Sequence, residues 1–589
     1  MILQALVKYY EDLVQQDKVP TRGWCQAKVS CAIELNEDGT VKAIIPLKHE
    51  EQYGDKKVLV SEQCYVPEMV TRSNEVAPQF LCDNAKYFLG IDSKGSTPSI
   101  LKRFFAAKER HLDILGNAKG EIARAICRFF ESWDPQAAAD HPMIKDHWKE
   151  LISGGNIVFS MKGYYAHEDP EIKELWMKQF EREDTCAKGT CLVTGEKTTI
   201  MRTHRKIHGV PGAQTSGASL VSFNETAFES YGKTQSYNAP VGAYAEFAYT
   251  TALNYLLGNK NCKFNLADSI IVFWAESGNA KYQELFSSIM KPRADNQSEL
   301  KRIFWNLQAG RKIELDDITI DPNQNFYLLC LAPSAARIAV RFFYRNSFGS
   351  IIKNLAEHHK RLEIVKPPYE KREDLSIKNI LDETANQKLT DKKSISKLAD
   401  NIFNAILYNT PYPHALYSQV MQRIRAENGN VTYGRAAIIK AFLIKNYNWK
   451  EGESFVALNV ETNDTAYVLG RIFALLEKIQ KDSAGSAGIN STISDLYFNS
   501  ACSRPASVYP HLFKLSKNHL RKIERSSMRK RKYYDKELST IMEKLEYNGI
   551  PNQLNEIDQS KFLTGYYHQK NALYTKKEPI AKENDGNEQ

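Results

Sequence analysis

The chain has 589 residues, of which 42% are hydrophobic, 25% charged and 11% aromatic, with 30 Gly and 21 Pro. This composition excludes collagen, a coiled coil and wholesale disorder, and the length predicts several domains. No apolar run approaches the roughly 20 residues of a membrane-spanning helix, and the first 14 residues lack the basic segment of a secretion signal. With ten cysteines and no CxxC pair, we expect reduced thiols in a cytoplasmic protein without a membrane partner.

The net charge of +9 is concentrated in one segment. Residues 511–536 contain ten Lys or Arg and two acidic residues, a local net charge of +8, which leaves only +1 for the rest of the chain. A basic element on a nearly neutral body predicts a polyanionic partner for one surface.

The first two thirds of the chain mix strand and helix patterns. The opening residues 2–14 have apolar positions at helical spacing, and two alternating runs, 28–35 and 41–45, flank an Asp-Gly turn that predicts a hairpin. We also expect helices over 98–132, 243–257 and 335–343, and strands over 155–160, 269–275 and 326–331.

From about residue 395 the pattern is almost entirely helical. The expected helices are 396–408, 415–427, 432–446, 464–481, 494–501, 508–532, 535–547 and 558–574. The fold class is therefore α+β, with mixed strand and helix domains followed by an all-helical C-terminal bundle. We divide the chain into an N-terminal domain (1–150), a mixed α/β body (151–394), a helical connector (395–449) and the bundle (450–589).

Known catalytic motifs are missing from the sequence. The two glycines of Gly212–Gly217 have the spacing of a phosphate-binding loop, but Ala218 and Ser219 stand where the phosphate-binding Lys and its neighbour would be. The pair His167-Glu168 is followed by Asp-Pro rather than by the second His of a zinc protease. The sequence therefore favours a protein that is not an enzyme.

One spacing is compatible with zinc. Two cysteines and two histidines follow the pattern C-x4-C-x12-H-x3-H, with Cys186, Cys191, His204 and His208 as the candidate ligands. Gly195, however, occupies the position where such a finger usually has an aromatic residue. We favour structural cysteines and surface histidines over a metal site, and we expect no cofactor.

The segment 209–232 is rich in small and hydroxyl residues and poor in charge. Its glycines allow close approach of the backbone to a ligand, and its Ser, Thr and Asn side chains can bond phosphate or sugar oxygens. A well-packed internal loop is an equally good interpretation from the residues alone.

The basic segment provides the sharpest functional signal. If residues 508–536 are helical, seven cations recur at spacings of three or four and form one stripe about 33 Å long, while Leu512, Leu515, His519 and Ile523 face a bundle. We favour binding of a nucleic-acid backbone over a merely solvated face for Lys514, Lys517, Arg521, Arg525, Arg529, Lys532 and Lys536. Weaker basic candidates on expected helices, for phosphate or for ion pairs in the fold, are Arg337, Arg341, Arg423, Arg425, Arg435, Lys440 and Lys445.

Several strings along the whole chain resemble a known family. They include Phe80–Gly90, Cys191–Gly195, Gln214–Gly232, Ala332–Arg337, Ala466–Phe473 and Leu563–Gln569. Together they resemble the large subunit of the type I-C CRISPR Cascade, the crRNA-guided DNA surveillance complex.

The resemblance implies a non-enzymatic subunit with many partners. Such a subunit reads a protospacer-adjacent motif (PAM) on double-stranded DNA, helps to open the duplex into an R-loop and helps to recruit a helicase-nuclease, while base pairing with crRNA reads the target. The implied partners are crRNA, target DNA, the helicase-nuclease, the backbone and crRNA-end-capping subunits, and a small subunit. Two alternatives are a nucleic-acid-processing enzyme with an unrecognised site and a stand-alone zinc-binding DNA-binding protein.

We place PAM reading in the N-terminal region. A polar loop bounded by prolines lies within a stretch that resembles the family, and Arg and Asn side chains can reach base edges in either groove. The candidates are Thr71, Arg72, Ser73, Asn74, Asn84 and Lys86, and the alternative for each is a capped turn.

The resemblance also implies that the C-terminal helices serve as a separate small subunit made by internal translation. Between Met290 and Met528 the sequence has one methionine, Met421, so initiation there or at a non-AUG codon for Val456, Val460 or Val468 is expected.

Overall fold

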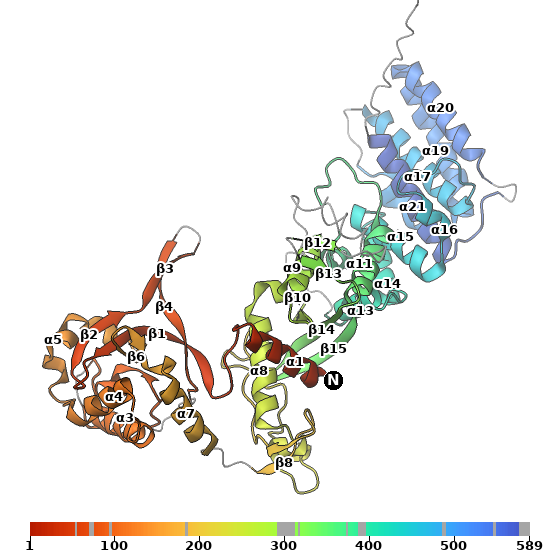
Figure 1. The fold of residues 1–589 in the computed structure, drawn as a ribbon. Helices are drawn as coiled ribbons and strands as arrows, with labels where there is room; N and C mark the ends of the chain where they lie inside the picture. Colours follow the sequence, from red (N-terminus) through yellow and green to blue (C-terminus); the bar gives the residue numbers. More distant parts are fainter. Residues whose placement is uncertain are drawn as a thin grey trace, which may run out of the picture. The chain divides into compact units, whose positions relative to one another are not determined.

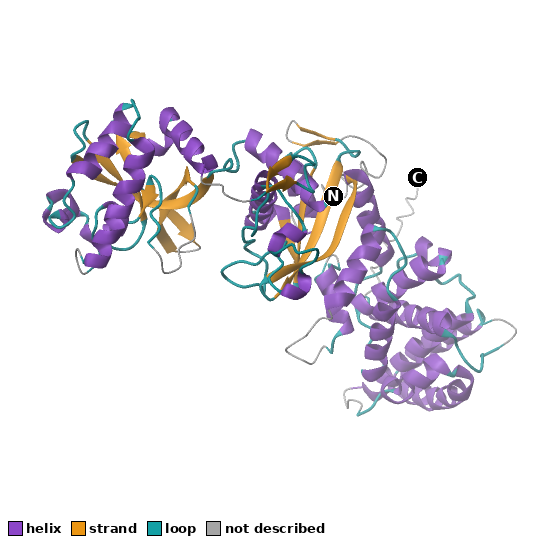
Figure 2. Ribbon diagram, turned by 90° about the horizontal axis from the view of Figure 1, so that it is seen from below, coloured by secondary structure: helices purple, strands orange, loops and turns teal. Residues whose placement is uncertain are grey.

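The computed structural model describes residues 1–53, 56–69, 76–93, 97–182, 187–290, 313–315, 318–372, 375–386, 396–485, 490–545 and 549–575. The chain divides into two compact units. Unit 1 comprises residues 1–209 and 214–258, and unit 2 comprises residues 210–213 and 259–589. Sheets with accompanying helices precede a helical C-terminal part, as the α+β assignment predicts (Figures 1 and 2).

Unit 1 is built on a seven-stranded mixed sheet. Its order is β3-β4-β1-β6-β5, with β2 paired to β1 and β7 paired to β6. The strands are β1 Trp24–Leu35, β2 Val41–Pro46, β3 Lys48–Tyr53, β4 Lys56–Pro67, β5 Cys82–Asp83, β6 Asn156–Met161 and β7 Tyr164–Tyr165. The predicted hairpin is confirmed, with Glu34 opposite Ala43. Because β6 pairs in parallel with β1, this sheet extends across the domain boundary expected at residue 150.

Aromatic side chains fill the space between this sheet and its helices. The Phe88 and Phe159 rings are stacked 4.7 Å apart, and Phe129 and Phe130 pack against them. Burying such rings supplies much of the free energy of folding in a core of this size. The helices are α2 Ala85–Phe88, α3 Pro98–Leu115, α4 Glu121–Ser132, α5 Pro142–Asp146, α6 Trp148–Leu151 and α7 Pro170–Arg182.

The remainder of unit 1 is a helix pair with a small hairpin. The first helix, α1 (Ile2–Gln15), packs along α8 (Ala243–Gly258), and Tyr10 lies edge-on against Phe247 with ring centroids 5.8 Å apart. The strands β8 (Lys188–Thr190) and β9 (Lys197–Thr199) form the hairpin.

Unit 2 begins with a four-stranded antiparallel sheet in the order β10-β11-β14-β15 (Figure 2). Its strands are β10 Lys263–Leu266, β11 Ser269–Ala275, β14 Asn325–Ser334 and β15 Arg337–Ser347, and a separate pair comprises β12 Ile313–Leu315 and β13 Ile318–Ile320. The helix expected over 335–343 is wrong. Ala335 has a φ of +53° and turns the chain, so that residues 337–347 pair with β14 instead.

Helices make up most of the rest of unit 2. They are α9 Ala280–Met290, α11 Phe348–Leu362, α12 Ile377–Thr384, α13 Ser396–Leu407, α14 His414–Ala426, α15 Tyr433–Tyr447, α16 Lys450–Ser454, α17 Thr465–Ala484, α18 Ile493–Ser503, α19 Pro505–Ser526, α20 Met528–Met542 and α21 Glu556–Tyr574.

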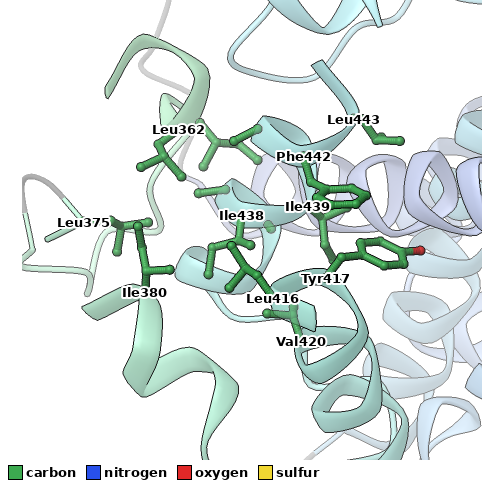
Figure 3. Packing of buried hydrophobic residues seen from close by; sticks show 14 of the residues in the cluster. Leu362, Leu375, Ile380, Leu416, Tyr417, Val420, Ile438, Ile439, Phe442 and Leu443 are labelled. Carbon is green, nitrogen blue, oxygen red and sulfur yellow. The ribbon is translucent and has the colours of Figure 1, made fainter. Parts of the chain in front are cut away.

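The buried helix α15 connects the sheet of unit 2 to its last helices. Its side chains Ile438, Ile439 and Phe442 lie among residues of α11, α12 and α14, and Phe442 stacks on Tyr417 at 4.7 Å (Figure 3). One continuous hydrophobic cluster runs from Phe264 in β10 to Tyr567 in α21. The C-terminal helices therefore share their core with the sheet instead of enclosing a separate one.

Candidate nucleic-acid interface

The basic segment folds as two helices, α19 and α20, which both pack on α17 (Figure 1). Leu512, Leu520 and Ile523 of α19 are buried, as is Ile541 of α20. The amphipathic pattern of the sequence thus predicts correctly which side of α19 enters the core.

The single helix expected over 508–532 is wrong, because the chain breaks at Ser527. Its φ of −162° and ψ of 102° are extended, and its hydroxyl accepts a hydrogen bond from the Lys530 amide at 3.3 Å. Serine is a preferred N-cap because its oxygen satisfies one amide of the first turn. The break divides the predicted stripe into two cationic faces, one on each helix.

The α19 face comprises Lys514, Lys517, Arg521 and Arg525, and the α20 face comprises Arg529, Lys532 and Lys536. The spacings of three and four place each set on one side of its helix, over about 17 Å and about 11 Å of helix axis. All seven residues are exposed. Within the described residues, none of these seven side chains forms a hydrogen bond or an ion pair.

The acids of this segment neutralise a different cation. Arg531 bonds to Asp535 through Nε, and its Nη1 lies 3.6 Å from Glu524. The two acidic residues of the segment are therefore engaged with Arg531, and no other acidic side chain of the described residues pairs with the two cationic faces.

Polar contacts with α17 fix the two basic helices. The Tyr534 hydroxyl donates to Asp482 at 2.6 Å, and His519 Nδ1 lies 3.0 Å from the Ser483 hydroxyl. Burial alone would raise the pKa of Asp482, but hydrogen bonds from Lys478 and Tyr534 lower it. An ionised carboxylate thus ties α20 to α17.

Several weaker basic candidates serve the fold. Arg435 is fully buried and bonds Glu427 at 2.7 Å, and buried Lys440 donates to the Glu363 carbonyl at 2.6 Å. Burial lowers the pKa of Lys440 to about 8. Arg341 lies on a strand, at about 4 Å from Asp268 and Asp400. The sequence left open whether these three residues bind phosphate or interact within the fold. The structure shows that they interact within the fold.

Of the PAM candidates, residues 71–74 lie outside the described residues, whereas Asn84 and Lys86 are described. The Asn84 side chain caps α2 by accepting a hydrogen bond from the Lys86 amide at 3.1 Å. Lys86 itself is half-buried, and its ammonium group has no hydrogen-bond or ion-pair partner in the described part of the chain.

The segment before α2 is held by buried polar groups. Asp83 accepts the Gln79 amide at 2.9 Å and the Asn84 amide at 2.8 Å. Leu81 has a φ of +56°, and its amide donates to His111 Nε2 at 3.0 Å. Burial lowers the pKa of His111 to about 4, so the imidazole is neutral and accepts this bond at Nε2.

A partly buried ion triad includes Glu68, which precedes the PAM candidates in the sequence. Arg205 bonds Glu68, which follows β4, at 2.5 Å, and it also bonds Glu246 of α8. Glu246 has no exposed surface, and burial raises its pKa although Arg205 opposes this. The sequence did not predict the triad, because its three residues are far apart in the chain and no local spacing connects them.

The zinc candidates have other neighbours. Cys186 lies outside the described residues. The Cys191 sulfur accepts the amides of Val193 and Thr194 at 3.3 and 3.5 Å, and His204 Nδ1 lies 2.6 Å from the Tyr249 hydroxyl. His208 is exposed. Over the described residues, no group of three His, Cys, Asp or Glu side chains is arranged to hold a metal ion.

Comparison with protein families identifies the chain. The model of the family described as CRISPR-associated protein (Cas_Csd1) matches residues 6–574. The chain belongs to this family. The match confirms the resemblance predicted from the sequence strings and makes the chain a CRISPR-associated Cascade subunit. A search of curated proteins found no match. No helix in the described ranges is long and apolar enough to span a bilayer.

Two of the family strings have a packing role in this CRISPR-associated protein. Ala466–Phe473 lies on α17 and Leu563–Gln569 on α21, and the glycine in each allows the two backbones to touch. A Cβ atom at Gly470 would be 2.0 Å from the Phe562 carbonyl oxygen, and one at Gly565 would be 2.1 Å from that of Tyr467. These strings therefore hold the bundle that carries the two cationic faces.

Proposed function

We propose that this chain is the non-catalytic, DNA-binding large subunit of a type I-C Cascade effector. It recognises the PAM on invading double-stranded DNA, supports R-loop formation and helps to recruit the helicase-nuclease. Its family membership supports the assignment to Cascade. In this division of labour the protein reads a short motif and holds the DNA, while crRNA reads the target sequence.

The observation that carries DNA binding is the pair of cationic faces on α19 and α20. Seven exposed cations with no acidic partner among the described residues form a surface that attracts phosphates. Lys and Arg side chains on a helix contact phosphates irrespective of the DNA sequence, so this surface holds DNA. The N-terminal candidates recognise the PAM sequence.

The test is the salt dependence of DNA binding by the assembled complex. Each phosphate contact contributes about 0.9 to the slope of log affinity against log salt concentration on duplex DNA. Replacing Arg521, Arg525 and Arg529 together with Ala should reduce this slope by about two to three and weaken binding to all target sequences alike.

Lys178→Ala is the control, since it removes an exposed cation on another helix, α7, that already bonds an acidic neighbour, Glu174, at 2.6 Å. We expect its slope to stay within about 0.3 of the unmodified complex, whereas Arg529→Ala alone should lower the slope by about 0.9. An unchanged slope in the triple variant would mean that the two faces do not contact DNA.

A further inference from the structure

An aromatic ring lies in the middle of the α20 cationic face. Tyr533 follows Arg529 by four residues and precedes Lys536 by three, so the three side chains share one side of the helix. The tyrosine is 44% exposed, and its hydroxyl has no hydrogen-bond partner among the described residues. The α20 face therefore presents a ring and two cations that the rest of the described chain does not engage through polar contacts.

The ring of Tyr533 is supported by its neighbour. Tyr534 is buried, and its ring lies edge-on against that of Tyr533 with the centroids 5.3 Å apart. The Tyr534 hydroxyl in turn donates to Asp482 of α17 at 2.6 Å. Because a supported side chain has less conformational freedom to lose, Tyr533 is better prepared to bind a ligand than a free surface tyrosine.

The acidic residues of α20 near this ring face other groups. Glu537 follows Tyr533 by one turn and is half-buried. Burial lowers the pKa of Arg471 on α17, and the charge of Glu537 partly opposes this, so Glu537 lies on the side toward α17. Asp535 bonds Arg531. Neither acid belongs to the row that contains Tyr533.

The α19 face has no such ring. Asn518 occupies the matching position, four residues after Lys514 and three before Arg521, and it is exposed. Both helices are described in full, and of their Phe and Tyr residues Tyr533 alone is exposed. The two faces therefore resemble each other in charge and differ in their aromatic content.

Cations and an aromatic ring in one row are the combination that binds single-stranded nucleic acid. Phosphates lie on the cations and a base stacks on the ring, irrespective of sequence, because every base has a π face. A paired base is covered by its neighbours in the duplex and cannot reach such a ring. An R-loop supplies unpaired DNA, since the guide pairs with one strand and displaces the other.

We propose that Tyr533 stacks on an unpaired base of the displaced DNA strand, whose phosphates lie on Arg529 and Lys536. The α20 face thereby selects single-stranded DNA, whereas the α19 face holds phosphates of either form. This inference rests on the proposed DNA binding by these two helices and adds to it a base-contacting residue and a preference for one form of DNA.

The first test compares two DNA forms that no guide can pair with. The full-length chain is titrated with a single-stranded oligothymidine and with an unrelated duplex of the same length. Tyr533→Leu should weaken binding to the single strand by at least about fivefold, the lower end of what one base–aromatic stack contributes, and should leave duplex binding within about twofold. Tyr533→Phe keeps the ring and should bind the single strand like the unmodified chain. Unchanged single-strand binding by Tyr533→Leu would overturn the proposal.

Tyr164→Leu is the matched control, because Tyr164 is 76% exposed on strand β7 outside the two cationic faces. Lys162, two residues before it, is engaged with Glu37 at 2.6 Å and with Glu121 at 3.1 Å. Single-strand binding by this variant should not change.

The salt slope separates this proposal from the proposed function. Tyr533→Leu keeps every cation, so its slope of log affinity against log salt concentration should equal that of the unmodified chain. If the triple variant of Arg521, Arg525 and Arg529 lowers the slope while Tyr533→Leu has no effect, the faces hold DNA without stacking and only the present proposal fails.

The second test identifies the strand in the assembled complex with guide RNA and target DNA. Light-activated 5-iodouracil, which cross-links to stacked aromatic side chains, is placed in the displaced strand or, separately, in the guide. The displaced strand should cross-link to the peptide that contains Tyr533, and Tyr533→Leu should abolish this product. A cross-link of this peptide to the guide alone, or no cross-link to it from the displaced strand, would overturn the proposal.

Discussion

At the scale of single residues, the sequence left two roles open for Asn84: contact with the PAM, or capping of a turn. The structure shows the capped turn, because the side-chain oxygen accepts the Lys86 amide. Capping alone does not exclude DNA contact, since Asn84 is half-buried and precedes Lys86, whose ammonium group has no partner among the described residues.

The substitution Asn84→Asp distinguishes the roles. Asp caps as well as Asn, so we expect the free energy of unfolding to change by less than about 0.5 kcal/mol, whereas Asn84→Ala should lower it by about 1 kcal/mol. If DNA lies against this turn, the added negative charge should weaken binding to a PAM-bearing duplex more than tenfold, with a smaller effect on a target opened in advance. Equal affinity of Asn84→Asp and the unmodified complex for the duplex would remove Asn84 from the PAM site.

At the scale of elements, the crossing of α17 and α21 is the most constrained contact of the helical part. The glycines of the two helices face the backbone of the opposite helix, so that no side chain fits between them. The two helices also share buried hydrogen bonds, including the Tyr566 hydroxyl to Glu477 at 2.7 Å.

Gly470→Ala should therefore destabilise the bundle although Ala favours helix. The added methyl group overlaps the Phe562 carbonyl, and overpacking of this kind costs about 1–3 kcal/mol, more than the roughly 1 kcal/mol gained in helix propensity. Chemical denaturation monitored by circular dichroism measures the difference. Gly258→Ala is the control, because nothing lies within 4 Å of a Cβ atom at this helix end. A Gly470→Ala variant as stable as the unmodified chain would show that the helices can move apart without cost.

At the scale of the whole molecule, the start site of the expected separate small subunit decides which packing contacts of unit 2 it keeps. Asp464 caps α17 by accepting the Tyr467 amide at 3.0 Å and also bonds Lys561 of α21 at 2.6 Å. A product that starts at Val468 lacks this cap, whereas a start at Val456 or Val460 retains it. A start at Met421 cuts α14 but retains α15, which packs on α21.

We therefore expect a shorter C-terminal species that begins before Asp464, detectable by mass spectrometry of complexes purified from this gene with its partners. Without α15, a species that begins at Val456 or Val460 exposes part of α21, so it should be recovered bound to the complex and not as a free chain. Val456 and Val460 are 45% and 49% exposed, so replacing both with Ala removes these start codons without disturbing the full-length fold. A complex with intact DNA binding that contains the full-length chain alone would contradict the prediction.

The sequence by itself determined the features that depend on local spacing. The helical period predicted α1, α8 and most C-terminal helices, and the same period identified the apolar side of α19 and the cations opposite to it. Family strings predicted the CRISPR-associated family, which the comparison confirms. These features depend on neighbouring residues, so they can be read along the chain.

Only the tertiary structure decided which of the chain's charges stay unpaired and which segments find hydrogen-bond partners. Residues 337–347 form a strand because β14 supplies its backbone partners, although the Ala and Arg residues at its start favour helix. Arg435 and Lys440 are buried, whereas the seven cations of the two faces are exposed, and the acidic residues of their segment bond Arg531 instead of them. Burial and ion pairing depend on residues distant in sequence, and no local period encodes them.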